Sequence, residues 1–317
     1  MTASRMAPSR ASLSLSGLGL PTTELDAVAT SDRRFPDGTS WRIEIPSVEG
    51  PACLDAVLEE AAAMDVPVVR ASQGSGVGLM RDAEIDAMVD AAAGAGVELS
   101  LFARPCAGWD ASAMALSPAG RVLAPTSRGS DQLAATVDEI LRAADHGVRS
   151  VLIADIGVLS VFGQMRAAGD LPPDMQAKIS VMLPAANPAA AKVLVDLGAD
   201  TLNLPTDLTL AQIASIRAVV DVPLDIYVEA PDNVGGFVRH YELPKLVEVA
   251  APVHIKFGLR NAPDVYPAGT HLEATTVALS RERVRRARLG LDLLARAGST
   301  AKGSVTGAEG LALPRRG

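Results

Sequence analysis

Two strand-like runs, Pro223–Ala230 and Pro252–Gly258, constrain the fold of this chain most strongly. In both runs polar or charged residues alternate with aliphatic ones, so that Asp225, Tyr227 and Glu229 share one face of the first run. Alternation with a period of two is typical of a strand with two different faces. A strand that helices cover on both sides would be almost continuously apolar, so these strands need a polar interior to face. The mouth of a barrel provides such an interior.

Composition and charge narrow the class of protein. The chain has 317 residues, of which 48% are hydrophobic, and this is enough for one large core or two modest ones. We find no apolar run near the roughly 20 residues that cross a bilayer, and the first residues lack the pattern of a signal peptide. We therefore expect a cytoplasmic protein without membrane contact. A net charge of -8 argues against a nucleic-acid partner.

The order of elements predicts a single barrel domain. Residues 1–39 form an N-terminal extension that we expect to be disordered or laid along the surface, and residues 298–317 a flexible tail. Between them, residues 40–297 alternate strands with helices. The expected strands are 41–46, 67–72, 97–104, 149–156, 178–183, 201–204, 223–230 and 252–258, and the expected helices are 52–64, 82–95, 132–146, 158–168, 188–197, 211–220, 241–250 and 281–297. Eight such units within about 250 residues predict an α/β fold of the TIM (β/α)8 barrel type. An open doubly wound sheet would not explain polar residues facing inward from so many strands.

The parity of each strand divides the inward polar residues into two groups. Those early in their strands lie at the stability face, and we expect them to form a structural ion network: Arg42, Arg70, Glu98, Asp225 and His254. Those late in their strands lie at the C-terminal face, where the active sites of such barrels form: Glu44, Ser72, Arg104, Asp155, Asn203, Glu229 and Lys256. Carboxylates and cations that converge on one mouth change each other's pKa values, so the late group is the candidate functional site.

Three residues of the late group, Asp155, Glu229 and Lys256, are the predicted catalytic centre. Glu229 and Lys256 come from neighbouring strands and are expected within charge-pairing distance, with Asp155 across the mouth. In one mechanism Lys256 attacks a carbonyl as a Schiff-base amine while a carboxylate moves the proton. In another, Glu44, Asp155 and Glu229 hold a divalent cation. In a third interpretation Lys256 only neutralises the carboxylates, and all three stay open.

The loops after the strands supply further candidates. In the run Gln73–Gly78, backbone N–H groups could hold an oxyanion or phosphate, although a plain turn fits equally well. The long connections Cys106–Asp131 and Leu259–Ser280 are expected to form a lid, a substrate wall or an interface. The residues predicted to bind substrate are Glu44, Ser72, Gln73, Arg104, Asn203, Arg260 and Asn261.

Four segments, Val151–Leu159, Asn187–Lys192, Leu197–Asp200 and Leu208–Ile213, resemble the core of the collagenase-like peptidases, peptidase family U32. The resemblance covers roughly residues 149–230. It implies a TIM-barrel core and an aspartate on the fourth strand. Several relatives in that family modify RNA or assist quinone hydroxylation with an iron–sulfur cluster held by four cysteines. This chain has only two cysteines, so we expect no iron–sulfur cluster.

The two cysteines, Cys53 and Cys106, are predicted to be dispensable, because neither has the neighbours that would make a reactive thiolate. The chain also lacks the Gly-x-Ser-x-Gly and His-Glu-x-x-His motifs of hydrolases. The charges at the mouth instead suit proton transfer or bond cleavage next to a carbonyl of a small polar or anionic substrate. We therefore favour a lyase or isomerase. A peptide hydrolase, a non-catalytic ligand- or partner-binding barrel and a homo-oligomer remain open, and the cofactor is unknown.

Overall fold

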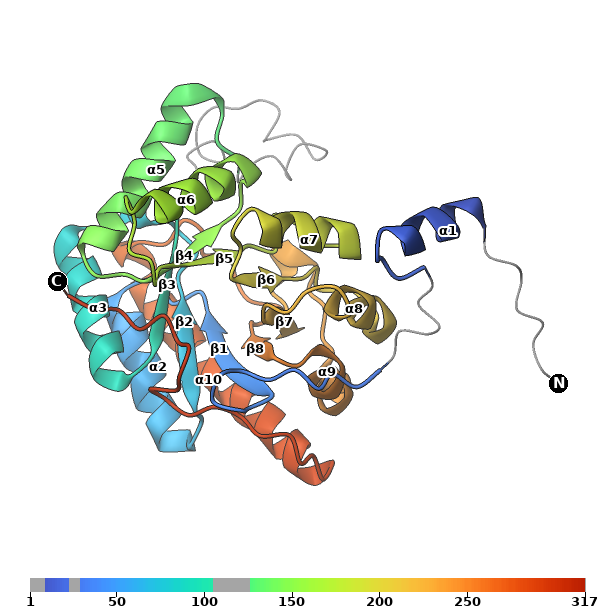
Figure 1. The fold of residues 1–317 in the computed structure, drawn as a ribbon. Coiled ribbons are helices and arrows are strands. Elements are labelled where there is room, and N and C mark those ends of the chain that lie inside the picture. Colours follow the sequence, from blue (N-terminus) through green and yellow to red (C-terminus); the bar gives the residue numbers. More distant parts are fainter. Residues whose placement is uncertain (1–8, 23–28, 105–125, 317) are drawn as a thin grey trace.

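The computed structural model describes residues 9–22, 29–104 and 126–316. Eight parallel strands pair in chain order, and the last pairs with the first to close a barrel (Figure 1). The strands are β1 (Trp41–Pro46), β2 (Val68–Ser72), β3 (Glu98–Phe102), β4 (Ser150–Ile153), β5 (Gln176–Ile179), β6 (Thr201–Asn203), β7 (Leu224–Glu229) and β8 (Val253–Phe257). The predicted TIM barrel is confirmed.

Helices surround the closed sheet (Figure 1). They are α2 (Pro51–Met64), α3 (Asp82–Ala95), α5 (Gly129–Asp145), α6 (Ile156–Ala168), α7 (Pro188–Asp196), α8 (Leu210–Arg217), α9 (Leu243–Ala250) and α10 (Glu273–Arg296), with short 3-10 turns η1 (Val77–Leu79), η4 (Asp232–Val234), η5 (His240–Glu242) and η6 (Thr270–Leu272). Side chains fix several starts: Asn187 caps α7 ahead of Pro188, and Thr209 forms a capping box with Gln212 at α8. The last helix begins eight residues earlier than the expected 281.

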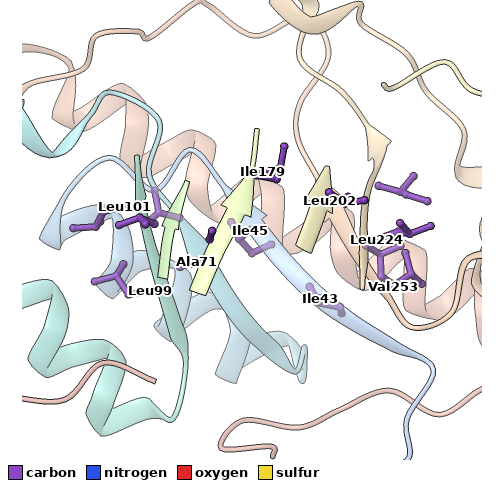
Figure 2. Packing of buried hydrophobic residues seen from close by; sticks show 14 of the residues in the cluster. Ile43, Ile45, Ala71, Leu99, Leu101, Ile179, Leu202, Leu224 and Val253 are labelled. Carbon is purple, nitrogen blue, oxygen red and sulfur yellow. The ribbon is translucent and has the colours of Figure 1, made fainter. Parts of the chain in front are cut away.

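The outward faces of the strands form the apolar core. Figure 2 shows Ile43, Ile45, Leu99 and Leu101 among these buried side chains, which pack beneath the helices. Burial of such side chains stabilises the fold by about 1.5–3 kcal/mol each. The alternate residues of the same strands point the other way, so every polar inward side chain lies inside a closed apolar wall.

The N-terminal end of the barrel is covered by the chain's own C-terminal segment, shown in red in Figure 1. Gly303 pairs with Trp41 of β1, Gly307 N donates to Gly96 O, and Arg315 N donates to Gly147 O. The residues contacted lie at or just before the starts of β1, β3 and β4. The segment 303–316 therefore lies against the barrel, whereas we expected a flexible tail. Its Gly- and Pro-containing sequence has no helical or strand period, so the sequence did not indicate this packing.

The N-terminal extension has two parts. Helix α1 (Arg10–Gly17) has no buried residue and stands outside the ring of helices (Figure 1). Residues 29–40 instead reach the barrel, where the ring of Phe35 stacks under the Arg42 guanidinium at 4.0 Å and meets the edge of His254. Of the helices in the described ranges, none combines the length and apolar character needed to cross a membrane.

Candidate functional site

Glu44 forms the centre of a buried ion network inside the barrel. Its Oε1 atom accepts a hydrogen bond from Ser72 Oγ at 2.6 Å and lies 2.9 Å from Lys178 Nζ and 3.2 Å from Lys256 Nζ. Its Oε2 atom lies 3.3 Å from Arg70 Nη1. Partners from β2, β5 and β8 thus converge on one fully buried carboxylate of β1. Buried charges persist only when they are paired in this way.

Asp225 forms a second anionic centre nearer the N-terminal end. Its Oδ1 atom lies 3.1 Å from Arg70 Nη1 and 2.9 Å from His254 Nδ1. Its Oδ2 atom lies 3.1 Å from Lys178 Nζ and accepts a hydrogen bond from Thr201 Oγ1. Arg70 and Lys178 therefore each bridge the two anionic centres. The ion network predicted for the early residues is present for Arg70, Glu98, Asp225 and His254, and it extends into the late group through Glu44. Arg42 lies outside it and pairs with Asp37 at 3.7 Å.

Lys256 occupies the part of the network closest to the C-terminal mouth. Its Nζ atom lies 4.3 Å from the centroid of the Tyr227 ring. In the amide orientation that satisfies both neighbours, Asn203 accepts a hydrogen bond from Lys256 Nζ at 2.9 Å and donates to the Asp225 carbonyl. Lys256 is 2% exposed and Tyr227 is 8% exposed, so both side chains are buried. The amine of Lys256 is thus held between a carboxylate, an amide and a ring.

When both lysines are protonated, the charges of this interior balance without any added ion. Arg70, Lys178 and Lys256 face Glu44, Asp225 and Glu98, whose Oε1 atom lies 2.7 Å from Arg70 Nε. Burial raises the pKa of Glu44, but the attraction of both lysines and of Arg70 outweighs it, and the pKa ends well below its usual range. The same holds for Asp225, where Lys178, Arg70 and His254 outweigh burial. Both carboxylates therefore stay ionised.

His254 and the two carboxylates predict loss of stability in acid. Burial, helped by Arg70, lowers the pKa of His254 to about 4, while the unfolded chain titrates near 6.5. The unfolded state therefore binds more protons below about pH 7, and His254 alone withdraws stability on the order of 3 kcal/mol between pH 7 and pH 4. Glu44 and Asp225, with lowered pKa values, act in the same direction below about pH 5.

Urea unfolding at a series of pH values measures this effect. We expect the free energy of unfolding to fall steadily from pH 7 to pH 4. The variant His254→Asn, whose side chain does not titrate, is expected to show a shallower fall between pH 7 and pH 5. Equal slopes for the two proteins in that interval would contradict a neutral, buried His254.

Lys178 is the member of the network that sequence reasoning missed. The strand was expected to begin at residue 178, but β5 begins at Gln176, so Lys178 lies within the strand and not at its start. It shares the inward parity of Ser180 and pairs laterally with Thr201. A search for charged residues with that parity on every strand, including the first expected residue, would have found it.

The predicted pairing of Glu229 with Lys256 is wrong. Tyr227 lies opposite Lys256, whereas Glu229 lies opposite Phe257, so β7 carries an irregularity between Tyr227 and Glu229. An extra residue of this kind changes which side chains face inward. Glu229 instead lies 3.1 Å from His240 Nε2 and 3.8 Å from Arg286 Nη1, outside the interior network.

Glu229 has a structural environment at the end of β7. Its Oε1 atom accepts a hydrogen bond from the Arg260 backbone N–H at 3.0 Å. Burial raises its pKa, but the His240 ring, this N–H and Arg286 together outweigh burial, and the pKa is lowered. Glu229 thus links the connection after β8 to the turn before α9. It does not contact Lys256 or Asp155, the other two residues of the predicted catalytic centre.

Asp155 caps a helix and does not face the barrel interior. Its Oδ1 atom accepts a hydrogen bond from Val158 N and its Oδ2 atom accepts one from Ser127 N, both at 2.9 Å. The strand β4 ends at Ile153, and its inward residues are Ser150 and Leu152, which pair with inward residues of β3. The expected strand 149–156 was too long, so the parity assigned to Asp155 was wrong.

The three carboxylates proposed for a divalent cation face different surroundings. Glu44 lies in the interior network, Asp155 caps α6, and Glu229 pairs with His240. Within residues 9–22, 29–104 and 126–316, no three His, Cys, Asp or Glu side chains are placed to hold one metal ion. The predicted metal set of Glu44, Asp155 and Glu229 is therefore wrong.

The glycine-rich loop after β2 binds the side chain of Glu49, a carboxylate of the protein itself. The Glu49 carboxylate accepts hydrogen bonds from Gly74 N at 2.9 Å and from Ser75 N at 3.0 Å, and Ser75 Oγ donates to it at 2.5 Å. Burial raises the pKa of Glu49, and these bonds only partly offset that effect. The backbone donors that we assigned to a substrate oxyanion thus have a resident partner.

The remaining predicted binding residues lie around this loop and on the surface. Gln73 bonds to Gly76 through both amide atoms, and Arg104 Nη1 donates to Gly74 O at 2.9 Å. Arg260 is 61% exposed at its side chain, with Asp232 3.7 Å away, and Asn261 is exposed. These four therefore lie outside the ion network around Lys256. The predicted residues Glu44, Ser72 and Asn203 are part of that network.

Of the two cysteines, only Cys53 lies in the part of the chain that the structure describes. Cys53 is a buried free thiol on α2 within the apolar core, and its dispensability stays a prediction. Cys106 lies outside the described residues, as does most of the predicted lid that begins there.

Solved structures and family models place this architecture among known proteins. The chain shares its barrel with the "putative fructose-1,6-biphosphate aldolase" from Coccidioides immitis, with a TM-score of 0.52 and 13% sequence identity over 82% of this chain and 92% of that chain. Such identity concerns the fold alone. Residues 122–230 match Peptidase family U32, which confirms the resemblance to that family over this part of the chain.

The U32 peptidase Mk0906 is 20% identical over 60% of this chain and 69% of that chain, with a TM-score of 0.39. No curated protein sequence matches the chain.

Proposed function

We propose that this barrel is a lyase or isomerase that uses the Lys256 amine to form an imine with a small carbonyl substrate. One observation carries the proposal: Lys256 Nζ lies in a buried interior, 3.2 Å from Glu44 Oε1, and Lys256 is the last inward residue of β8 before the C-terminal mouth. An amine that is removed from water and adjacent to a carboxylate is suited to attack a carbonyl, because the carboxylate can accept its proton.

The chemistry follows from these neighbours. Unprotonated Lys256 attacks the carbonyl carbon, and loss of water gives a protonated imine that draws electrons from the adjacent bond. Glu44, which the neighbouring cations keep ionised despite its burial, accepts the proton that leaves that adjacent carbon when the C–H bond breaks. Return of a proton to carbon at the same or a different position, followed by addition of water, releases the product and the free amine. That sequence is the isomerase outcome. In the lyase outcome the bond between the adjacent carbon and a hydroxyl-bearing carbon breaks, Glu44 takes the hydroxyl proton, and that fragment leaves as a second carbonyl compound.

The surroundings favour a small substrate whose reacting end is uncharged. The interior cations and anions already neutralise one another, so a carboxylate placed next to Lys256 would meet Glu44 without a spare cation. A cavity of about 290 Å³ lies at the C-terminal ends of β5, β6 and β7, and Met182, Pro205 and Val234 are among its lining residues. These residues follow the strands that carry Lys178, Asn203 and Tyr227, and we assign the cavity to the rest of a small molecule as part of the proposal.

Borohydride trapping tests the proposal directly. Purified protein is incubated with a panel of small aldehydes, ketones and 2-oxo acids, reduced with sodium borohydride and analysed by intact-mass and peptide mass spectrometry. We expect a stable adduct on Lys256 with at least one compound, and complete loss of that adduct in Lys256→Met. The matched control is Lys245→Met on α9, where the side chain is 47% exposed and pairs with Glu248 on the surface.

The alternative outcomes are also informative. An adduct that persists in Lys256→Met, or an absence of any Lys256 adduct across the panel, would contradict the proposal. A Lys256→Met protein that is less stable, with no carbonyl adduct in the parent protein, would assign Lys256 the role of a structural counter-ion for Glu44.

A further inference from the structure

Lys178 and Lys256 reach the same carboxylate oxygen from opposite sides of the network. Lys178 Nζ lies 2.9 Å from Glu44 Oε1, and Lys256 Nζ lies 3.2 Å from that atom. The two lysines belong to β5 and β8, which are not neighbours in the barrel. A single oxygen atom therefore links two amines, each within hydrogen-bonding distance.

The surroundings of the two amines differ. Lys178 faces Glu44 from β1, Asp225 from β7, Arg70 from β2 and Lys256 from β8, and it is 1% exposed. Lys256, by contrast, has Asn203 and the ring of Tyr227 beside it on the mouth side. Lys178 is thus enclosed by charges, whereas Lys256, the last inward residue of β8, is the amine that the proposed function assigns to the substrate.

We infer that Lys178 is a proton-relay residue that acts through Glu44 and prepares Lys256 for reaction. The ammonium of Lys256 gives a proton to Glu44 Oε1, and the carboxyl passes it to the unprotonated amine of Lys178. Lys256 is left with a free electron pair, Glu44 is again a carboxylate, and Lys178 becomes an ammonium held by Glu44 and Asp225. The net charge of the interior does not change in this transfer.

The electrostatics of Lys178 agree with this role. Burial lowers its pKa, the attraction of Asp225 and Glu44 only partly restores it, and the charges of Lys256 and Arg70 lower it further. Lys178 is therefore unprotonated in a larger fraction of molecules than an ordinary lysine. An interior with one carboxylate between two amines can exchange the proton without bringing in bulk water.

The test measures Lys256 reactivity without needing the natural substrate, although the role of the relay rests on the proposed function. The full-length protein is treated with formaldehyde and sodium cyanoborohydride at pH 6 to 10, and methylation of each lysine is followed by peptide mass spectrometry. Formaldehyde condenses with a neutral amine, water leaves, and cyanoborohydride supplies the hydride. Exposed Lys245 gives the reference profile for an ordinary lysine.

Lys178→Arg is the informative variant, because arginine keeps the positive charge beside both carboxylates but does not accept a proton. We expect the Lys256 rate near pH 7 to fall roughly 10²-fold, at the lower end of what a positioned base contributes, and its profile to move toward that of Lys245. Lys192→Arg, at an exposed position of α7, is the matched control and should leave the Lys256 profile unchanged. Lys178→Gln serves as a second variant if Lys178→Arg does not fold.

The outcomes separate this inference from the proposed function. An unchanged Lys256 rate and pH profile in the folded Lys178 variants would overturn the relay, as would a parent protein in which Lys256 stays unmodified. Fast Lys256 methylation that depends on Lys178, together with no adduct from the carbonyl panel, would support the relay and contradict the proposed imine chemistry.

Discussion

Replacing Asp225 by Asn is expected to lower the free energy of unfolding by about 3–5 kcal/mol, the range for breaking a buried ion pair from one side. The carboxylate has Arg70 at 3.1 Å and Lys178 at 3.1 Å, and it is fully buried. Asparagine keeps the shape but not the charge. Both cations would then remain in the barrel interior with only part of their compensation.

Urea unfolding at pH 7 measures the effect, with Asp207→Asn as the control. Asp207 is exposed in the connection after β6, so the same chemical change there is expected to alter stability by no more than about 0.5 kcal/mol. A loss below about 1 kcal/mol for Asp225→Asn would show that the network tolerates an unbalanced charge, and the ion network would then need a different explanation.

Removal of residues 303–317 is expected to cost roughly 3–6 kcal/mol of stability. Arg42 donates to Ser304 Oγ at 2.9 Å and to the Glu309 carbonyl at 2.5 Å, and Ala312 N donates to Glu98 at 3.2 Å. Hydrogen bonds to charged groups contribute about 1.5–3 kcal/mol each, and at least two of these would be lost from buried charges. Unfolding followed by tryptophan fluorescence is a suitable measurement, because Trp41 packs against Gly303.

A single substitution distinguishes specific contacts from general covering of the surface. Ser304 is 2% exposed, and its hydroxyl joins Asp37 at 2.5 Å, Thr39 at 2.6 Å and Arg42. Ser304→Ala is therefore expected to account for about 1–3 kcal/mol of the truncation effect. If the truncated protein unfolds at the same urea concentration as the full chain, the segment contributes nothing to stability and the interpretation fails.

The sequence was sufficient for the barrel and for much of the interior network. Alternation in Asp225, Tyr227 and Lys256 requires a polar interior, and the parity of β1, β2, β7 and β8 identified Glu44, Arg70 and His254 as inward residues. These predictions hold because a regular strand has a strict period of two. They need no knowledge of which strands are neighbours.

The failures have two physical causes. Parity is lost wherever a strand ends early or contains an irregularity, and this moved Asp155 onto a helix cap and turned Glu229 away from Lys256. The second cause is contact between residues distant in sequence. The Glu49 carboxylate fills the glycine-rich loop, and the segment after residue 302 covers the N-terminal end of the barrel, and neither has a local sequence signal.

The covering of one end of the barrel by residues 303–316 has a kinetic consequence. Arg42, Glu98 and His254 are at most 2% exposed at that end, so a molecule that reaches Lys256 arrives through the C-terminal mouth. Substrate and product must then travel along one path in opposite directions. An imine-forming reaction at this site would show competitive inhibition by its product, and a second reactant could enter only after the first product had left.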